Sequence, residues 1–189
     1  MKTCYQSGLF ILVTTLMVSG CTPQAEVSSV HQDVQTLSHE MRTLQTETRD
    51  VAWQNALNAR STEGAWLIPG ANTPARLTSQ LGLLTFTLSR VGPTGNGVTV
   101  YIHIHRDGDK GLPAFNGNLV WGKLSGTLEH YQQVNTHSLQ FQAPAALSAP
   151  VDIDLAIHLP DTQLSDVGFI RIHGLSPSDT SMDTPDTTQ

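Results

Sequence analysis

Strict alternation of apolar and polar side chains marks residues 98–105, which read Val98-Thr99-Val100-Tyr101-Ile102-His103-Ile104-His105. Side chains along a β-strand point alternately to opposite faces, so this pattern predicts a strand with one buried face and one wet face. Residues 151–159 alternate in the same way, with Asp152, Asp154 and His158 placed between aliphatic residues. The core of the protein is therefore expected to be built from sheets.

The segments on either side extend this pattern. Alternating apolar residues also precede a turn rich in Gly at 92–97, so residues 83–105 are expected to form a hairpin. Further strands fit residues 65–68, 115–121, 124–131, 137–142 and 166–173. About seven or eight strands without a helix between them are typical of an antiparallel sandwich. We therefore expect residues 64–175 to form an immunoglobulin-like antiparallel β-sandwich, with a small barrel as the alternative.

Composition argues against several classes of function. The 189-residue chain has a formal net charge of −6 and only 14% charged residues. Its basic residues are scattered, whereas nucleic-acid-binding domains need a clustered basic surface, so no nucleic-acid partner is predicted. The two cysteines, Cys4 and Cys21, lie outside the strand-rich region, so no disulfide is expected there. Residues 176–189 are polar almost throughout and are expected to be a disordered tail.

A heptad pattern precedes the strands. Apolar or β-branched residues recur at alternating spacings of three and four, at Val27, Val30, Val34, Leu37, Met41, Leu44, Thr48 and Val51. A repeat of this length without Gly or Pro predicts a coiled-coil-type helix, and we expect a helical stalk over residues 27–60. Because the apolar seam is narrow, an isolated helix would bury little of it, and the seam favours a partner helix.

The charges beside the seam favour one orientation of that partner. Glu26, Asp33, Glu40 and Glu47 share the g position of the heptad, whereas the e positions are neutral. An antiparallel pair would place these acids opposite one another, so the pattern predicts a parallel homo-oligomer, dimer or trimer, through residues 27–51. The alternative is a single helix that packs back on its own domain.

The end of the helix has a different character. Trp53 and Leu57 lie four residues apart, on a different face from the seam. We expect the last two turns to lean on the globular domain, with Trp66 covering both side chains and Trp121 filling the core. This junction is where an apolar patch for an unidentified envelope partner is expected.

The N-terminus has the organisation of an export signal. Lys2 precedes an apolar run over residues 9–18, which is too short to span a bilayer as a helix. The next residues, Val18-Ser19-Gly20-Cys21, resemble the lipobox of bacterial lipoproteins. The resemblance implies that residues 1–20 are a signal peptide and that Cys21 is lipidated with acyl chains such as palmitate, followed by a tether over residues 21–26.

Those acyl chains make the membrane the first predicted partner, because several long chains together hold a protein firmly on a bilayer. The residue after the cysteine is Thr22 rather than Asp. By resemblance to enterobacterial lipoproteins, Thr22 implies location at the periplasmic face of the outer membrane.

Several motifs resemble those of one family. They are Asn58-Ala59-Arg60-Ser61, Leu67-Ile68-Pro69-Gly70-Ala71, Thr73-Pro74-Ala75-Arg76-Leu77, Leu112-Pro113-Ala114-Phe115 with Gly117, and Gly168-Phe169-Ile170-Arg171-Ile172-His173. With the lipobox and the helical segment, they are similar to the YajI-type lipoproteins of enterobacteria, over nearly the whole chain except the C-terminal tail. The family is of unknown function, so the resemblance implies no catalytic or ligand residue.

Two histidines on one strand are the candidate for chemistry. His103 and His105 lie two residues apart on the wet face, a spacing that offers two imidazoles to one zinc ion, with His158 or His173 as a third ligand. Ordinary polar alternation explains the same residues, so no metal site is predicted and the two histidines stay candidates. Asp152 and Asp154 are interpreted as groups that keep an edge strand soluble.

No other segment carries a catalytic signature. Residues 107–111 resemble a calcium loop only faintly, and residues 122–126 do not match a nucleophile elbow. We therefore predict no catalytic residues, no cofactor and no enzymatic activity. The function expected is a lipid-anchored, periplasm-facing module that acts in envelope structure or partner binding. The alternative is a protein that binds a small ligand, a metal or a glycan.

Overall fold

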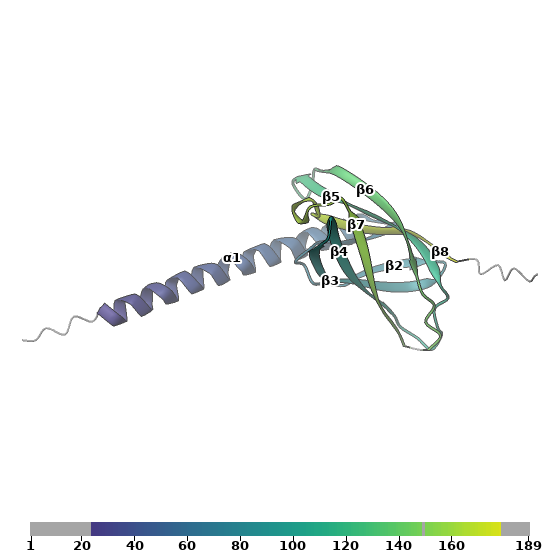
Figure 1. Ribbon diagram of the computed structural model, residues 1–189, viewed down its shortest axis with the longest axis horizontal. Coiled ribbons are helices and arrows are strands. Elements are labelled where there is room, and N and C mark those ends of the chain that lie inside the picture. The colour runs from purple at the N-terminus through teal and green to yellow at the C-terminus, as the bar shows by residue number, and fades with distance from the viewer. Residues whose placement is uncertain (1–23, 149, 179–189) are drawn as a thin grey trace, which may run out of the picture. The chain divides into compact units, whose positions relative to one another are not determined.

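The computed structural model describes residues 24–148 and 150–178 (Figure 1). The expected signal peptide, Cys21 and residues 179–189 of the expected tail lie outside the described residues. Within these residues, one helix, α1 (Gln24–Arg60), precedes eight strands and a short 3-10 helix, η1 (Leu164–Asp166). The strands are β1 (Gly64–Leu67), β2 (Ala75–Ser79), β3 (Gly82–Thr94), β4 (Gly97–Arg106), β5 (Phe115–Gly126), β6 (Tyr131–Ala143), β7 (Val151–Pro160) and β8 (Phe169–Pro177).

The strands form two four-stranded antiparallel sheets. One has the order β1-β8-β5-β6 and the other the order β2-β3-β4-β7. Alternate side chains of both sheets contribute to one hydrophobic core, which includes the fully buried Phe86, Ile104, Phe115, Leu119 and Ile170. The prediction of a mainly β chain with an N-terminal helix is therefore confirmed.

The helix is longer at its start than the heptad pattern predicts. α1 runs over 37 residues that contain no Gly or Pro, and it ends at Arg60 before the Gly64 that begins β1. Five of its seam residues are exposed, with exposed fractions between 55% and 65% at Val30, Val34, Leu37, Met41 and Leu44, whereas Val51 is half-buried. The chain divides into two units between Glu40 and Met41, so α1 contributes to both.

The last turns of α1 pack on the domain, as expected. Leu57 is 2% exposed and lies in a second hydrophobic cluster with Trp66 and Phe169, against which Trp53 also packs. Trp121 is buried in the main core, as predicted. Two polar residues fasten the same junction: Asn58 Nδ2 donates to Trp66 O at 2.8 Å, and Trp66 N donates to Asn58 Oδ1 at 2.8 Å.

The predicted break after residue 121 is wrong. β5 continues through Gly122 to Gly126, and the expected strand 124–131 is divided between β5, a turn at 127–130 and the start of β6. The ladder is irregular between Trp121 and Lys123, and a Cβ on Gly122 would lie 2.9 Å from the carbonyl oxygens of Val134 and Asn135. Glycine therefore permits a close approach of two backbones inside the strand, where the sequence suggested its end.

Two further boundaries differ from expectation. β2 was not predicted, because it is a five-residue strand at the sheet edge with only Ala75 and Leu77 buried. β8 starts at Phe169 and extends to Pro177, two residues beyond the expected end of the domain at 175. Its end is held by pairing with β5 and by Ser178 N, which donates to Ala114 O at 2.8 Å.

Candidate functional site

The candidate site is a cluster of histidine and aspartate side chains on the paired strands β4 and β7. These strands pair antiparallel, with His103 opposite Asp154 and His105 opposite Asp152. Directly opposite residues of an antiparallel pair share one face of the sheet, so all four side chains lie on the same face. The residues between them, including Ile104 and Ile153, are buried in the core. The apolar residues thus keep the register that brings two histidines against two carboxylates.

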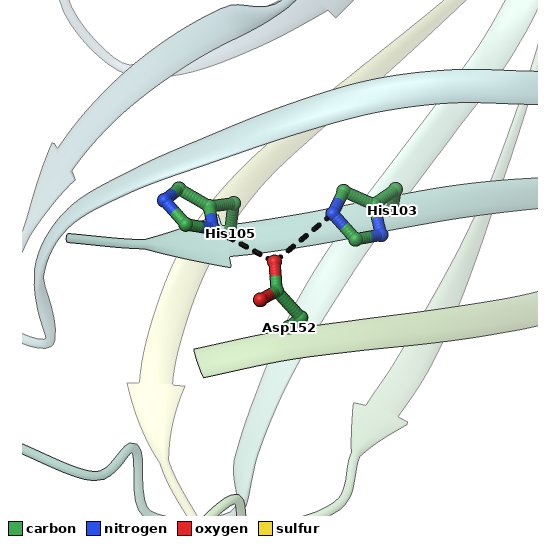
Figure 2. A group of neighbouring side chains, drawn as sticks. All are labelled: His103, His105 and Asp152. Atoms are coloured by element: carbon green, nitrogen blue, oxygen red, sulfur yellow. Dashed lines mark hydrogen bonds and ion pairs between the residues drawn. The ribbon is translucent and has the colours of Figure 1, made fainter. Parts of the chain in front are cut away.

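One carboxylate oxygen lies at the centre of the cluster, as Figure 2 shows. Asp152 Oδ1 is 2.8 Å from His105 Nδ1 and 3.2 Å from His103 Nε2. One ligand atom from each of these three residues lies within 4.8 Å of the other two. Two nitrogen atoms and one oxygen atom therefore converge on a small volume at the surface of the sheet.

The other ring nitrogens also face carboxylates. His103 Nδ1 is 2.9 Å from Asp154 Oδ1, and His105 Nε2 is 3.0 Å from Asp107 Oδ1. Each imidazole is thus held between two aspartates, one of which, Asp152, is shared. The rings have both edges engaged, which limits their rotation about the side-chain bonds.

The cluster is open to solvent and is electrostatically coupled. The side chains of His103, His105 and Asp152 are 37%, 32% and 51% exposed. Hydrogen bonds to Asp152 first, and to Asp107 second, raise the pKa of His105 above its ordinary value. The hydrogen bond from His105 lowers the pKa of Asp152. Both shifts favour the charged forms, but solvent screens the attraction between groups this exposed.

The third potential metal ligand beside His103 and His105 is Asp152, whereas the sequence suggested His158 or His173. His158 lies opposite Thr99 on the same strand pair, and His173 lies on β8 in the other sheet. Neither belongs to the cluster of His103, His105 and Asp152. The sequence did show the signal that finds Asp152, because residues 98–105 and 151–159 are the two most regular alternating segments.

The structure also shows the contacts made by two other segments from the sequence analysis, residues 107–111 and 122–126. Asp107, in the segment that weakly resembles a calcium loop, forms an ion pair with His105. Lys123, within the segment 122–126, forms a 2.7 Å ion pair with Asp166 of η1. Its hydrogen bond to Asp166 lowers the pKa of that carboxyl.

Comparison with known proteins relates the chain to one family. Residues 21–181 match the model of a family described as a protein of unknown function, DUF3251. The chain is 38% identical over 169 residues to the uncharacterized lipoprotein YajI of Escherichia coli strain K12, which covers 89% of this chain and 94% of YajI.

Solved structures agree with this relationship. The solution NMR structure of uncharacterized lipoprotein YajI from Escherichia coli matches with a TM-score of 0.68 and 36% identity, over 75% of this chain and 84% of that one. The trimeric lipoprotein SadB of Salmonella enterica has a similar fold, with a TM-score of 0.50 and 11% identity over 82% and 80% of the two chains. The YajI-type resemblance is thereby confirmed, and the chain belongs to the DUF3251 family of lipoproteins of unknown function.

Proposed function

We propose that the protein is a lipid-anchored module of the bacterial cell envelope that acts in envelope structure or partner binding rather than in catalysis. The observation that carries this proposal is the lipobox Val18-Ser19-Gly20-Cys21 in a chain whose relative YajI is a lipoprotein. The family match also begins at Cys21, the residue that would become the first of the mature protein. Residues 1–20 are then a removed signal peptide.

The anchor supplies the localisation. A thioether-linked diacylglyceryl group and an amide-linked chain such as palmitate at Cys21 would bury three long chains, each CH₂ contributing about 0.8 kcal/mol of membrane affinity. Among the described residues, no helix combines the length and apolarity needed to cross a bilayer. With Thr22 after the cysteine, the proposed location is the periplasmic face of the outer membrane.

The two sheets and helix α1 are consistent with a module that binds other proteins through its surface. Two four-stranded antiparallel sheets around one core support an immunoglobulin-like sandwich. The exposed seam from Val30 to Leu44 supports a parallel coiled coil between copies of the chain, as a dimer or trimer. The likeness to SadB concerns the fold, so the oligomer rests on the seam and its flanking acids.

Metabolic labelling with palmitate tests the anchor. Cys21→Ser removes the only thiol of the lipobox, so labelling and sedimentation with membranes are expected to be lost. Cys4→Ser, a matched change inside the signal, is expected to leave both intact. On separation of the membranes, the wild-type chain is expected with the outer membrane. Equal labelling of the Cys21→Ser and wild-type proteins would refute the proposal.

A further inference from the structure

In the cluster on β4 and β7, ring nitrogens of two histidines converge on one carboxylate oxygen, an arrangement that a solvent-exposed strand does not need for solubility. The inner nitrogens His103 Nε2 and His105 Nδ1 both point at Asp152 Oδ1, at 3.2 Å and 2.8 Å. Their outer nitrogens, Nδ1 and Nε2, are each bonded to a separate carboxylate, Asp154 and Asp107. We propose that His103, His105 and Asp152 are the ligands of a divalent transition-metal ion such as Zn²⁺.

The count of donors and acceptors supports this assignment. A neutral imidazole offers one N–H and one lone pair, and an ionised carboxylate only accepts. In a metal complex the outer nitrogens would keep donating to Asp154 and Asp107, while the inner nitrogens would give up any proton shared with Asp152 and direct lone pairs to the ion. Two imidazole nitrogens and a carboxylate oxygen would then converge on one ion. A cation is the species that complements such a group.

The outer carboxylates have the role of orienting the ligands. Histidines that bind metals usually donate their other ring N–H to a carboxylate, a carbonyl or water, which sets the tautomer and the ring orientation. Here Asp154 holds His103 at 2.9 Å and Asp107 holds His105 at 3.0 Å. Both rings are therefore already turned so that their inner nitrogens face the shared Asp152. Asp154 and Asp107 are positioning residues rather than ligands.

Charge and geometry fit a small dication. Three carboxylates lie around the two imidazoles, and a dication bound between the ring nitrogens and Asp152 would offset much of their negative charge. Atoms that bind one tetrahedral zinc ion lie about 3.3 Å apart. The inner distances of 2.8 Å and 3.2 Å need only a small opening of side chains that are partly exposed.

The chemistry of the donors selects the class of metal. Two imidazoles and one carboxylate suit Zn²⁺, Cu²⁺ or Ni²⁺, whereas Ca²⁺ and Mg²⁺ prefer all-oxygen sites. Three protein ligands leave a fourth tetrahedral position on the solvent side, which water or an exogenous ligand can fill. The site is built on two adjacent strands of one sheet and does not depend on the lipid anchor.

Titration calorimetry with Zn²⁺ tests the site in the untagged protein, purified from membranes in detergent micelles. We expect one saturable Zn²⁺ per chain, lost in His103→Ala, in His105→Ala and in the isosteric Asp152→Asn variant. His158→Ala is the matched control, because His158 is an exposed histidine on β7 outside the cluster, and it is expected to bind as the wild type does. Asp107→Asn and Asp154→Asn should each weaken binding by about tenfold.

All five cluster variants change side chains on the solvent face, so their unfolding midpoints in metal-free buffer are expected to stay close to the wild-type value. The proposal is overturned if the wild-type protein shows no saturable uptake of Zn²⁺. It is also overturned if uptake survives in the three ligand variants, or if His158→Ala abolishes it equally.

Discussion

The histidines of this chain have different environments, which shift their pKa values in opposite directions at His105 and His173. His103 and His105 face solvent between carboxylates on one sheet. His173 lies on β8 of the other sheet, where β1 and β5 flank it at Gly64 and Asn118. Burial lowers the pKa of His173, the positive charge of Arg171 adds to the effect, and Glu63 opposes it. The protonated form of His173 is therefore disfavoured in the folded protein.

This environment predicts a dependence of stability on pH. Because the folded-state pKa of His173 is lowered, the unfolded chain takes up this proton first as the pH falls. The free energy of unfolding should decline as the pH drops below the ordinary value of 6.5 and level off below the folded-state pKa. In His173→Gln that part of the decline should be absent, as measured by denaturant unfolding at several pH values.

A surface histidine gives the control for this measurement. His130 is exposed in the turn between β5 and β6, and His130→Gln should keep the wild-type decline. If His173→Gln and the wild-type protein lose stability in parallel between about pH 7 and pH 5, burial of His173 does not control the effect.

At the scale of elements, the periodicity of the sequence predicts helix α1. The structure leaves much of the apolar seam of this helix exposed. The seam residues Leu37, Met41 and Leu44 repeat as predicted, and all three are more than 60% exposed. Exposed apolar residues of this size on a regular repeat favour burial against another helix. The acids at the g positions favour the parallel orientation of that helix.

Disulfide cross-linking in intact envelopes tests the parallel coil. Equal positions of a parallel seam face each other closely enough for a disulfide, so Leu44→Cys should give covalent dimers if the protein lies in the oxidising periplasm, as proposed above. Thr46→Cys lies on the opposite side of the same helix and should give few. Cross-linking that is equal at the two positions, or absent at both, would contradict the parallel seam.

The strands show which patterns can be read locally. β4 and β7 were predicted because apolar and polar residues alternate along them without interruption. β6 was divided wrongly, because it is an edge strand with mostly exposed side chains and so lacks a clear alternation. The glycine at 122 added a second misleading signal, since it stands inside β5 where two backbones approach closely. Edge strands and bulges need their neighbours to be recognised.

For the whole molecule, the junction of helix and sheets forms a second core. The buried Gln54 links it to the loop between β1 and β2: its Nε2 donates to Thr73 O at 2.6 Å, and its Oε1 accepts from Ile68 N at 2.8 Å. Leu57 is buried in the cluster that also contains Trp66 and Phe169. The last turns of α1 therefore belong to the folded domain rather than to a separate stalk.

Truncation of Leu57 tests this conclusion. Leu57→Ala leaves a cavity in a closed cluster and should lower the free energy of unfolding by about 2–5 kcal/mol. Denaturant unfolding followed by tryptophan fluorescence measures it, because Trp53 and Trp66 belong to the same junction. Leu147→Ala is the control, since Leu147 is 88% exposed and its loss should change stability by less than about 0.5 kcal/mol. Equal midpoints for both variants would mean that the helix end adds no stability.

The sequence by itself determined the mainly β class, a helix over residues 27–60 and the membership in a lipoprotein family, because periodicity and short motifs are local properties of the chain. Only the tertiary structure decided that Asp152 meets His105, 47 residues away. That meeting depends on the register of β4 against β7, which the packing of their inner faces on the shared core sets. A shift of one residue would turn Asp152 into the core and leave the two histidines without it.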